Sequence, residues 1–204
     1  MRMRTGVSAM VAAASAGVLL APLPAAAAPD STRGPHCVVK VDTGKSTCYD
    51  TFRESIAAAT GGRITDAPLT PQKAAKDKKF LARLDASAKA AANTSTTRAA
   101  ASARIGGWLF EHGWYGGRSL ALSINADDCV HDGRWDGGID WLGPYGFNDI
   151  TSAVMSAGDC SVELYTDGYY QGSSTNYGYA EWVGSFMNDK ASAVRLKANF
   201  EVVR

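Results

Sequence analysis

One short phrase of polar residues occurs twice near the C-terminal end of the chain. Residues 147–154 read F-N-D-I-T-S-A-V, and residues 187–194 read M-N-D-K-A-S-A-V. Each copy supplies a carboxamide, a carboxylate and a hydroxyl, and oxygen atoms of these kinds are the ligands that Ca²⁺ prefers. The same side chains also stabilise turns by hydrogen-bonding to nearby backbone groups. The phrase is therefore typical of either a cation site or a structural turn, present in two copies.

Patterns that would indicate catalysis are weak. Neither H-E-x-x-H nor G-x-S-x-G occurs, and Glu111-His112 has no second metal ligand at helical spacing. Glu163 and Glu181 match the paired carboxylates of a glycosidase by residue type only, and their places in predicted strands favour exposed charges. The sequence predicts a protein that is not an enzyme.

The two phrases close two repeated units. The first unit contains F-E-H-G-W-Y-G-G from residue 110, and the second contains Y-T-D-G-Y-Y-Q-G from residue 165. Gly117 and Gly172 end these segments, where a tight hairpin requires positive φ. Each unit continues to a Trp-x-Gly sequence and then to the polar phrase, and short alternating runs indicate strands. Because one such unit cannot bury its own apolar face, we expect two units packed face to face.

These segments resemble the βγ-crystallin (Greek-key) family, in its microbial secreted two-motif type. The resemblance covers about residues 106–198 and implies an all-β fold, a two-motif Greek-key β-sandwich over residues 106–204. The motifs would span about residues 107–154 and 161–198.

The resemblance also implies Ca²⁺ binding, because microbial members use (Asn/Asp)-(Asn/Asp)-x-x-(Ser/Thr)-Ser to hold one ion per motif. The matching residues are Asn148, Asp149 and Ser152 in the first motif and Asn188, Asp189 and Ser192 in the second. Family sites also take a backbone carbonyl from a hairpin of the opposing motif, which corresponds to about Glu111 and Thr166. The sequence departs from the pattern at its last position, where Ala153 and Ala193 replace serine.

The first residues have the features of a secretory signal. Two arginines precede an apolar stretch over residues 7–20, and Ala25 and Ala27 fit the small-x-small rule of a signal-peptidase site. The apolar stretch is shorter than the roughly 20 residues that a membrane helix requires. We therefore assign residues 1–27 as a signal peptide and expect a secreted, extracellular protein without a membrane span.

Residues 28–105 are expected to form a small α+β or helical N-terminal region. Residues 28–62 predict a disulfide-closed hairpin and a short helix that opens with the capping box at Thr51 and Glu54. Residues 63–105 predict a basic Ala/Lys-rich helix, starting after Thr70-Pro71 and ending near Ala92, followed by a linker. Aromatic residues are not interleaved with the basic ones, so nucleic acid is not an expected partner, and docking within the chain is favoured.

Four cysteines in an exported chain predict two disulfides. Three pairings exist, and the arrangement of domains favours Cys37 with Cys48 and Cys129 with Cys160.

The predicted function is non-enzymatic binding of Ca²⁺ by a monomer, mainly for domain stability. The alternative is a protein-binding effector, because some secreted relatives of this family are metalloprotease inhibitors or antimicrobial toxins. In that case the loop from Cys129 to Trp141 would contact an extracellular protease or a cell-surface target. Trp135, which has no counterpart in the second unit, is the expected partner-binding residue. Trp141 has a counterpart in Trp182 and is expected in the core.

Overall fold

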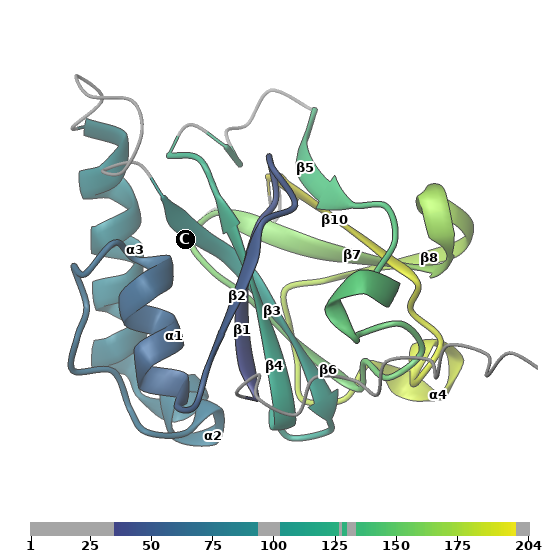
Figure 1. Ribbon diagram of the computed structural model, residues 1–204, viewed down its shortest axis with the longest axis horizontal. Helices are drawn as coiled ribbons and strands as arrows, with labels where there is room; N and C mark the ends of the chain where they lie inside the picture. Colours follow the sequence, from purple (N-terminus) through teal and green to yellow (C-terminus); the bar gives the residue numbers. More distant parts are fainter. Residues whose placement is uncertain (1–34, 94–102, 127, 130–133, 199–204) are drawn as a thin grey trace, which may run out of the picture. The chain divides into compact units, whose positions relative to one another are not determined.

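Two β-sheets stacked face to face form the centre of the molecule in a computed structural model (Figure 1). The structure describes residues 35–93, 103–126, 128–129 and 134–198, so the expected signal peptide and most of the expected linker lie outside the described residues. One sheet has the strand order β2-β1-β4-β3-β6-β9, and the other has the order β5-β10-β7-β8. Among the described helices, none is long and apolar enough to cross a membrane.

The two motifs exchange one strand each. In the first motif the strands are β3 (Arg104–His112), β4 (Gly116–Ile124), β5 (Trp135–Ile139) and β6 (Ala153–Ser156). In the second they are β7 (Cys160–Asp167), β8 (Gln171–Tyr177), β9 (Tyr179–Ala180) and β10 (Ala193–Ala198). The third strand of each motif pairs in the sheet of the other, β5 with β10 and β9 with β6. The predicted two-motif Greek-key β-sandwich is confirmed.

The hairpin glycines have the predicted conformation. Gly117 has a φ of 70° and Gly172 a φ of 72°. Residues that carry a Cβ disfavour this backbone region. A Cβ at Gly117 would also lie 2.9 Å from Oε2 of Glu111. Both positions therefore require glycine for the β3–β4 and β7–β8 hairpins to close.

Apolar side chains from both sheets meet between the layers. Leu109 and Leu122 from the six-stranded sheet share this core with Val162 and Leu196 from the four-stranded sheet, and all four are fully buried. The disulfide between Cys129 and Cys160 lies at the edge of the same core. It links the long β4–β5 connection to the first residue of β7.

The N-terminal hairpin belongs to the same sheet as the first motif. Strands β1 (His36–Lys40) and β2 (Ser46–Tyr49) are antiparallel and are joined by the disulfide between Cys37 and Cys48. Strand β1 also pairs with β4, in parallel, with His36 opposite Ser119 and Lys40 opposite Ser123. The sequence places this hairpin in a separate region, whereas hydrogen bonding makes it an extension of the sandwich.

Three helices follow the hairpin: α1 (Phe52–Ala59), α2 (Pro71–Lys76) and α3 (Lys78–Asn93). The capping box of Thr51 and Glu54 is formed as predicted. The single basic helix expected up to Ala92 is instead divided at Asp77. Oδ1 of Asp77 accepts hydrogen bonds from the backbone N–H groups of Lys79 and Phe80, both at 3.0 Å, and so starts a new helix.

The helices cover the outer face of the six-stranded sheet and form a third layer (Figure 1). Phe52 of α1 and Phe80 of α3 are fully buried in a cluster with Trp108, Phe110 and Met155 from the sheet. The apolar stripe of the basic helix thereby gains the partner that a marginal helix needs.

Candidate metal centre

The two polar phrases lie in loops that face each other. Asn148 and Asp149 follow the 3₁₀ turn η1 (Gly143–Tyr145), and Asn188 and Asp189 follow α4 (Gly184–Met187). The N–H of Asp149 donates to the carbonyl of Ala191 at 3.0 Å, and the N–H of Asp189 donates to the carbonyl of Thr151 at 3.1 Å. Each loop is thus hydrogen-bonded to the other in the same way, as a pseudo-twofold relation between the motifs requires.

Side chains of the two phrases cross between the motifs. Oγ of Ser152 donates to Oδ1 of Asp189 at 3.1 Å, and Oγ of Ser192 donates to Oδ1 of Asp149 at 3.4 Å. The sequence groups each Asp with the Ser of its own motif. The structure instead brings each Asp next to the Ser of the other motif, because the loops are exchanged across the sandwich.

Both aspartates have a left-handed backbone. The φ angle is 57° at Asp149 and 55° at Asp189. A residue with a Cβ loses about 1–2 kcal/mol in this conformation, although Asp and Asn tolerate it better than most. The two copies of the phrase therefore share the same unusual backbone conformation at Asp.

The carboxamides differ between the copies. Nδ2 of each Asn donates to its neighbouring carboxylate, at 2.6 Å for Asn148 with Asp149 and 2.7 Å for Asn188 with Asp189. Oδ1 of Asn188 accepts a hydrogen bond from Nε1 of Trp182 at 3.1 Å. Oδ1 of Asn148 is buried and has no hydrogen-bond partner within the described part of the chain. An amide oxygen is chemically able to accept a hydrogen bond or to coordinate a hard cation.

The two backbone segments that are expected to supply carbonyl ligands lie next to the serines. The N–H of Ser152 donates to the carbonyl of Phe110, the residue before Glu111, at 2.9 Å. In the second motif the N–H of Ser192 donates to the carbonyl of Tyr165, the residue before Thr166, at 2.8 Å.

The side chains of these two residues are already engaged. The carboxylate of Glu111 accepts from the guanidinium of Arg118, and this lowers the pKa of Glu111. Oγ1 of Thr166 accepts from the N–H of Ser173. These contacts hold the carboxylate of Glu111 at Arg118 and the hydroxyl of Thr166 at Ser173.

The donor set is rich in oxygen and poor in carboxylate. Within the described residues, no group of three or more His, Cys, Asp or Glu side chains is placed to hold a metal ion. Each crossed pair offers one carboxylate, one hydroxyl and nearby amide and carbonyl oxygens. Ca²⁺ accepts such a mixed shell of six to eight oxygens completed by water, whereas zinc selects nitrogen and sulfur ligands.

The tryptophans depart from expectation. Trp141 and Trp182 are 42% and 56% exposed, so the prediction that Trp141 lies in the core is wrong. The Trp141 ring lies over Gly143 and Gly168, where an added Cβ would meet it. Trp135 is 43% exposed on β5, with the Arg195 guanidinium 5.2 Å and the Lys197 ammonium 4.9 Å from its ring centre. The glycine of Trp-x-Gly lies under the ring only in the first motif, since a Cβ at Gly184 would meet nothing within 4 Å, so the repeated sequence does not by itself indicate a ring lying on glycine.

No protein-family model and no curated protein matches the chain. Among solved structures, a double mutant of a βγ-crystallin domain from Clostridium beijerinckii matches over 45% of this chain and 96% of its own, with 24% identity and a TM-score of 0.37. The chain is similar to βγ-crystallin domains. A βγ-crystallin domain from Flavobacterium johnsoniae matches over 46% of this chain and 96% of its own, with 24% identity and a TM-score of 0.38. The N-terminal domain of protein S matches the crystallin-like part over 46% of this chain and 96% of its own, with 18% identity and a TM-score of 0.37.

Proposed function

We propose that the protein binds two Ca²⁺ ions, each between the Asp of one motif and the Ser of the other, and that the ions stabilise the domain. The observation that carries this proposal is the crossed pair of contacts, 3.1 Å from Ser152 to Asp189 and 3.4 Å from Ser192 to Asp149. An ion at either place would join the two motifs. An ion that binds only the folded domain stabilises it by about 2.7 kcal/mol when its concentration is a hundredfold above Kd.

The first site would consist of Asp189, Ser152 and the backbone at Glu111, and the second of Asp149, Ser192 and the backbone at Thr166. Buried Oδ1 of Asn148 supports the second site, because this acceptor lacks a partner among the described residues. One carboxylate per site implies weak binding, with a Kd of about 10⁻⁶ M or higher. Such an affinity suits an extracellular fluid rather than the low free Ca²⁺ of cytoplasm.

Calorimetric titration of Ca²⁺ into the chelator-stripped mature protein tests this function. Two binding events are expected in the native protein and one each in Asp149→Ala and Asp189→Ala, with a lower melting temperature in Ca²⁺ for both variants. Asp42→Ala removes an exposed carboxylate on the β1–β2 turn and should leave both events intact. Absence of heat, together with a melting temperature that does not respond to Ca²⁺, would reduce the phrases to structural turns.

Double variants test the crossed assignment of the ligands. Asp149→Ala with Ser192→Ala removes two ligands of one site, so one binding event should remain. Asp149→Ala with Ser152→Ala removes one ligand from each site, so both events should weaken or disappear. The opposite result would assign each Asp to the Ser of its own motif.

The same proposal includes secretion and a non-catalytic role. Two disulfides support an oxidising compartment. Glu163 lies in β7 of the four-stranded sheet, whereas Glu181 follows β9 of the six-stranded sheet, which argues against a pair of cooperating carboxylates. N-terminal sequencing of protein from the culture medium should begin at Ala28; recovery of the chain only inside cells would contradict secretion.

A second candidate function is protein binding through the loop from Cys129 to Trp141. Exposure of Trp135 on strand β5 favours it, because a large aromatic side chain presented by a strand can serve as an anchor that loses little conformational entropy on binding. Part of this loop lies outside the described residues. Inhibition of a secreted metalloprotease, lost in Trp135→Ala, would support the candidate, and full protease activity at a tenfold excess of the protein would remove it.

A further inference from the structure

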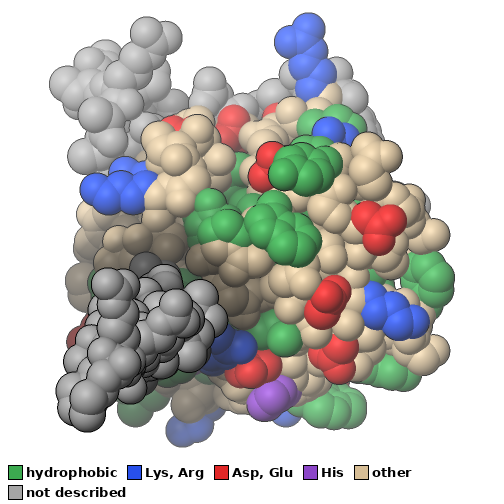
Figure 2. All heavy atoms as spheres, turned by 45° about the vertical axis from the view of Figure 1, so that its right-hand side comes forward, with side chains coloured by type: hydrophobic (Ala, Val, Ile, Leu, Met, Phe, Trp, Pro, Cys, Tyr) green, Lys and Arg blue, Asp and Glu red, His purple; other side chains and the backbone are tan. Residues whose placement is uncertain are grey.

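Large apolar side chains at the surface are nearly all aromatic. Eight such residues are exposed among the described residues, and only Leu69 is aliphatic. The others are Trp114, Trp135, Trp141, Tyr169, Tyr179, Trp182 and Phe186. Figure 2 shows hydrophobic side chains gathered into patches, with carboxylates around them, on the face that the view brings forward. This composition differs from an ordinary protein interface, which is no more apolar than the remaining surface and gathers Met and Arg together with its aromatic residues.

Four of these aromatic residues fall into two pairs, called ring pairs below, and in each pair a backbone hydrogen bond joins one residue to the chain next to the other. Trp114 lies at the tip of the β3–β4 hairpin. Its backbone N–H donates to the backbone carbonyl of Glu181, the residue before Trp182, at 2.6 Å. Tyr169, at the tip of the β7–β8 hairpin, donates its N–H to the carbonyl of Asp140, the residue before Trp141, also at 2.6 Å. Each hairpin tip of one motif is therefore fixed beside the tryptophan of the other motif. Trp114 and Tyr169 are 68% and 70% exposed.

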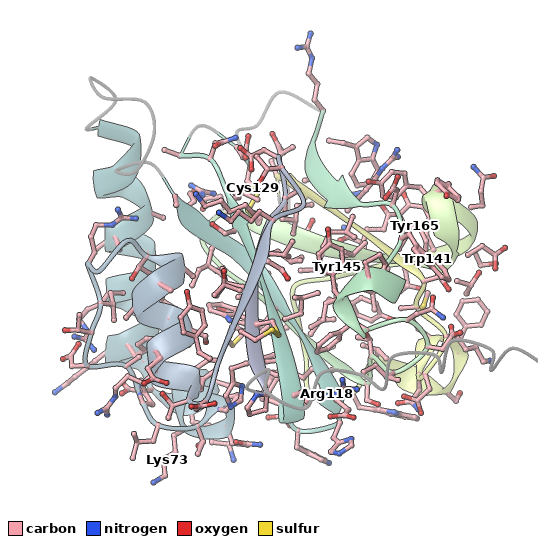
Figure 3. All side chains as sticks on the ribbon, in the orientation of Figure 1. Lys73, Arg118, Cys129, Trp141, Tyr145 and Tyr165 are labelled. Atoms are coloured by element: carbon pink, nitrogen blue, oxygen red, sulfur yellow. A yellow bond between two sulfur atoms is a disulfide. The ribbon has the colours of Figure 1, made fainter. Side chains whose placement is uncertain are left out.

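The tryptophans are held in place by local contacts. Cε3 of Trp141 is 3.1 Å from the position that a Cβ on Gly168 would occupy, so the ring lies close against the backbone. Trp182 is held by the hydrogen bond from Nε1 to Oδ1 of Asn188 at 3.1 Å. Figure 3 shows Trp141 on the side of the sandwich away from α1, α2 and α3. Rings held before a ligand arrives lose little conformational entropy on binding.

The chemistry around the rings favours a neutral sugar. The face of an aromatic ring carries partial negative charge and attracts the C–H groups on the flat side of a pyranose. Carboxylates and carboxamides are hydrogen-bond acceptors for hydroxyl groups. Asp140 and Glu181 directly precede the two tryptophans in the sequence, and Asn188 is hydrogen-bonded to Trp182. Residues 106–204 carry 13 Asp/Glu against 6 Lys/Arg, a balance that repels polyanions.

We propose that the two ring pairs, Trp114 with Trp182 and Tyr169 with Trp141, are stacking sites for a neutral polysaccharide. Each pair contacts sugar rings of the polymer. Two equivalent pairs on one domain allow a single long ligand, or two neighbouring chains, to be held with higher avidity than one pair provides. This binding needs no metal ion and is independent of the calcium function.

The test uses the full mature protein and six named probes. Retardation is measured in native gels that contain mixed-linkage β-glucan, glucomannan, hydroxyethyl cellulose or starch, and sedimentation is measured with cellulose and chitin powders. At least one probe is expected to retain the protein equally in Ca²⁺ and in chelator. Trp114→Asn combined with Tyr169→Asn should weaken that retention at least tenfold. Asn is chosen because both positions have positive φ, 59° and 56°, which Asn tolerates.

Phe186→Ala is the matched control, since it removes a ring that is 54% exposed and outside the two pairs, and this variant should be retained by the probe as the native protein is. Thermal melts establish that each variant is folded. Failure of all six probes to retain the native protein, or retention unchanged in the double Asn variant, overturns the proposal. Retention that is lost in Phe186→Ala and kept in the double variant also overturns it, because the binding surface would then lie at α4.

Discussion

The two motifs present the same aromatic corner to different surroundings. In the first motif Phe110 and Tyr115 contact each other with ring centres 5.3 Å apart, and in the second Tyr165 and Tyr170 do so at 5.7 Å. The first pair is buried in the cluster that the N-terminal helices form. In the second pair the Arg195 guanidinium lies 3.7 Å from the ring centre of Tyr170. The first corner is covered by the N-terminal helices, and the second is covered by the guanidinium of Arg195 at the surface.

Residues at equivalent positions on the outer faces of the two sheets differ in the same way: they are apolar where helices cover the sheet and charged where the sheet faces water. Trp108 and Met155 of the first motif are fully buried, whereas Glu163 and Arg195 occupy the corresponding places in the second. Without the helices, the first motif would expose a large apolar patch of the kind that marks an interaction site. The N-terminal region is therefore the third layer that the first motif requires, and the second motif has adapted the same face to water.

Phe80→Ala should have the largest effect on this comparison. Phe80 is fully buried between α3 and the six-stranded sheet, and truncating such a ring costs about 3–5 kcal/mol of unfolding free energy. Denaturant titration measures the loss. Leu69→Ala, at a site 59% exposed, is the control and should change little. Equal, small losses in the two variants would mean that the helices are not an integral layer.

Tyr115→Ala and Tyr170→Ala compare the two corners directly. Tyr115 is 4% exposed, and burial raises the pKa of its hydroxyl to about 12. Its loss should cost about 3 kcal/mol, because a cavity forms beneath the helices. Tyr170 is less enclosed, so its loss should cost only about 1 kcal/mol, mostly from the contact with Arg195. A larger cost at Tyr170 than at Tyr115 would reverse the comparison.

The sandwich could be predicted because its signals are local and repeated. Strand alternation, the hairpin glycines and the two polar phrases all recur in the same order, and the structure follows them. The third layer was not predicted. Its signal in the sequence is that Trp108 and Met155 stand where the second motif has Glu163 and Arg195, and each residue alone is compatible with a two-layer core. Only comparison of the repeats distinguishes a covered face from an open one.

The parts that sequence could not predict depend on contacts between distant segments. Residue order assigns Ser152 and Asp149 to one motif, whereas the exchange of loops places Ser152 beside Asp189. The exposure of Trp141 has a similar origin, because Gly168 of the other motif provides the surface on which its ring lies. The counterpart of Trp141 in the second unit, Trp182, led to the prediction of a core position, whereas both rings are exposed in the structure.

The proposed calcium sites should differ because their carboxamides do. Oδ1 of Asn148 is buried without a partner in the described part of the chain, while Oδ1 of Asn188 is bonded to Trp182. Asn148→Ala should therefore weaken the Ca²⁺ event that depends on Asp149 by about tenfold, or 1.4 kcal/mol. Asn188→Ala should change the other event less than about threefold. Calorimetry resolves the two events in each variant, and equal changes would show that neither amide oxygen distinguishes the sites.

Acidification should give the smallest effect, confined to the hairpin that extends the first motif. Nδ1 of His36 is 2.9 Å from Oγ of Ser119, and its ring contacts Phe52 edge-on with centres 5.7 Å apart. Burial lowers the pKa of His36 below 6.5, since the charged ring is desolvated. The neutral ring therefore contributes stability above pH 6.5, and this contribution is lost as pH falls through the lowered folded-state pKa. Because the ring is partly exposed and solvent screens its charge, the melting temperature should fall by no more than about 4 °C, the shift that 1 kcal/mol produces in a chain of this size. His36→Gln keeps a polar side chain without titration and should remove this part of the acid dependence; a pH profile identical to that of the native protein would show that His36 does not link the hairpin to pH.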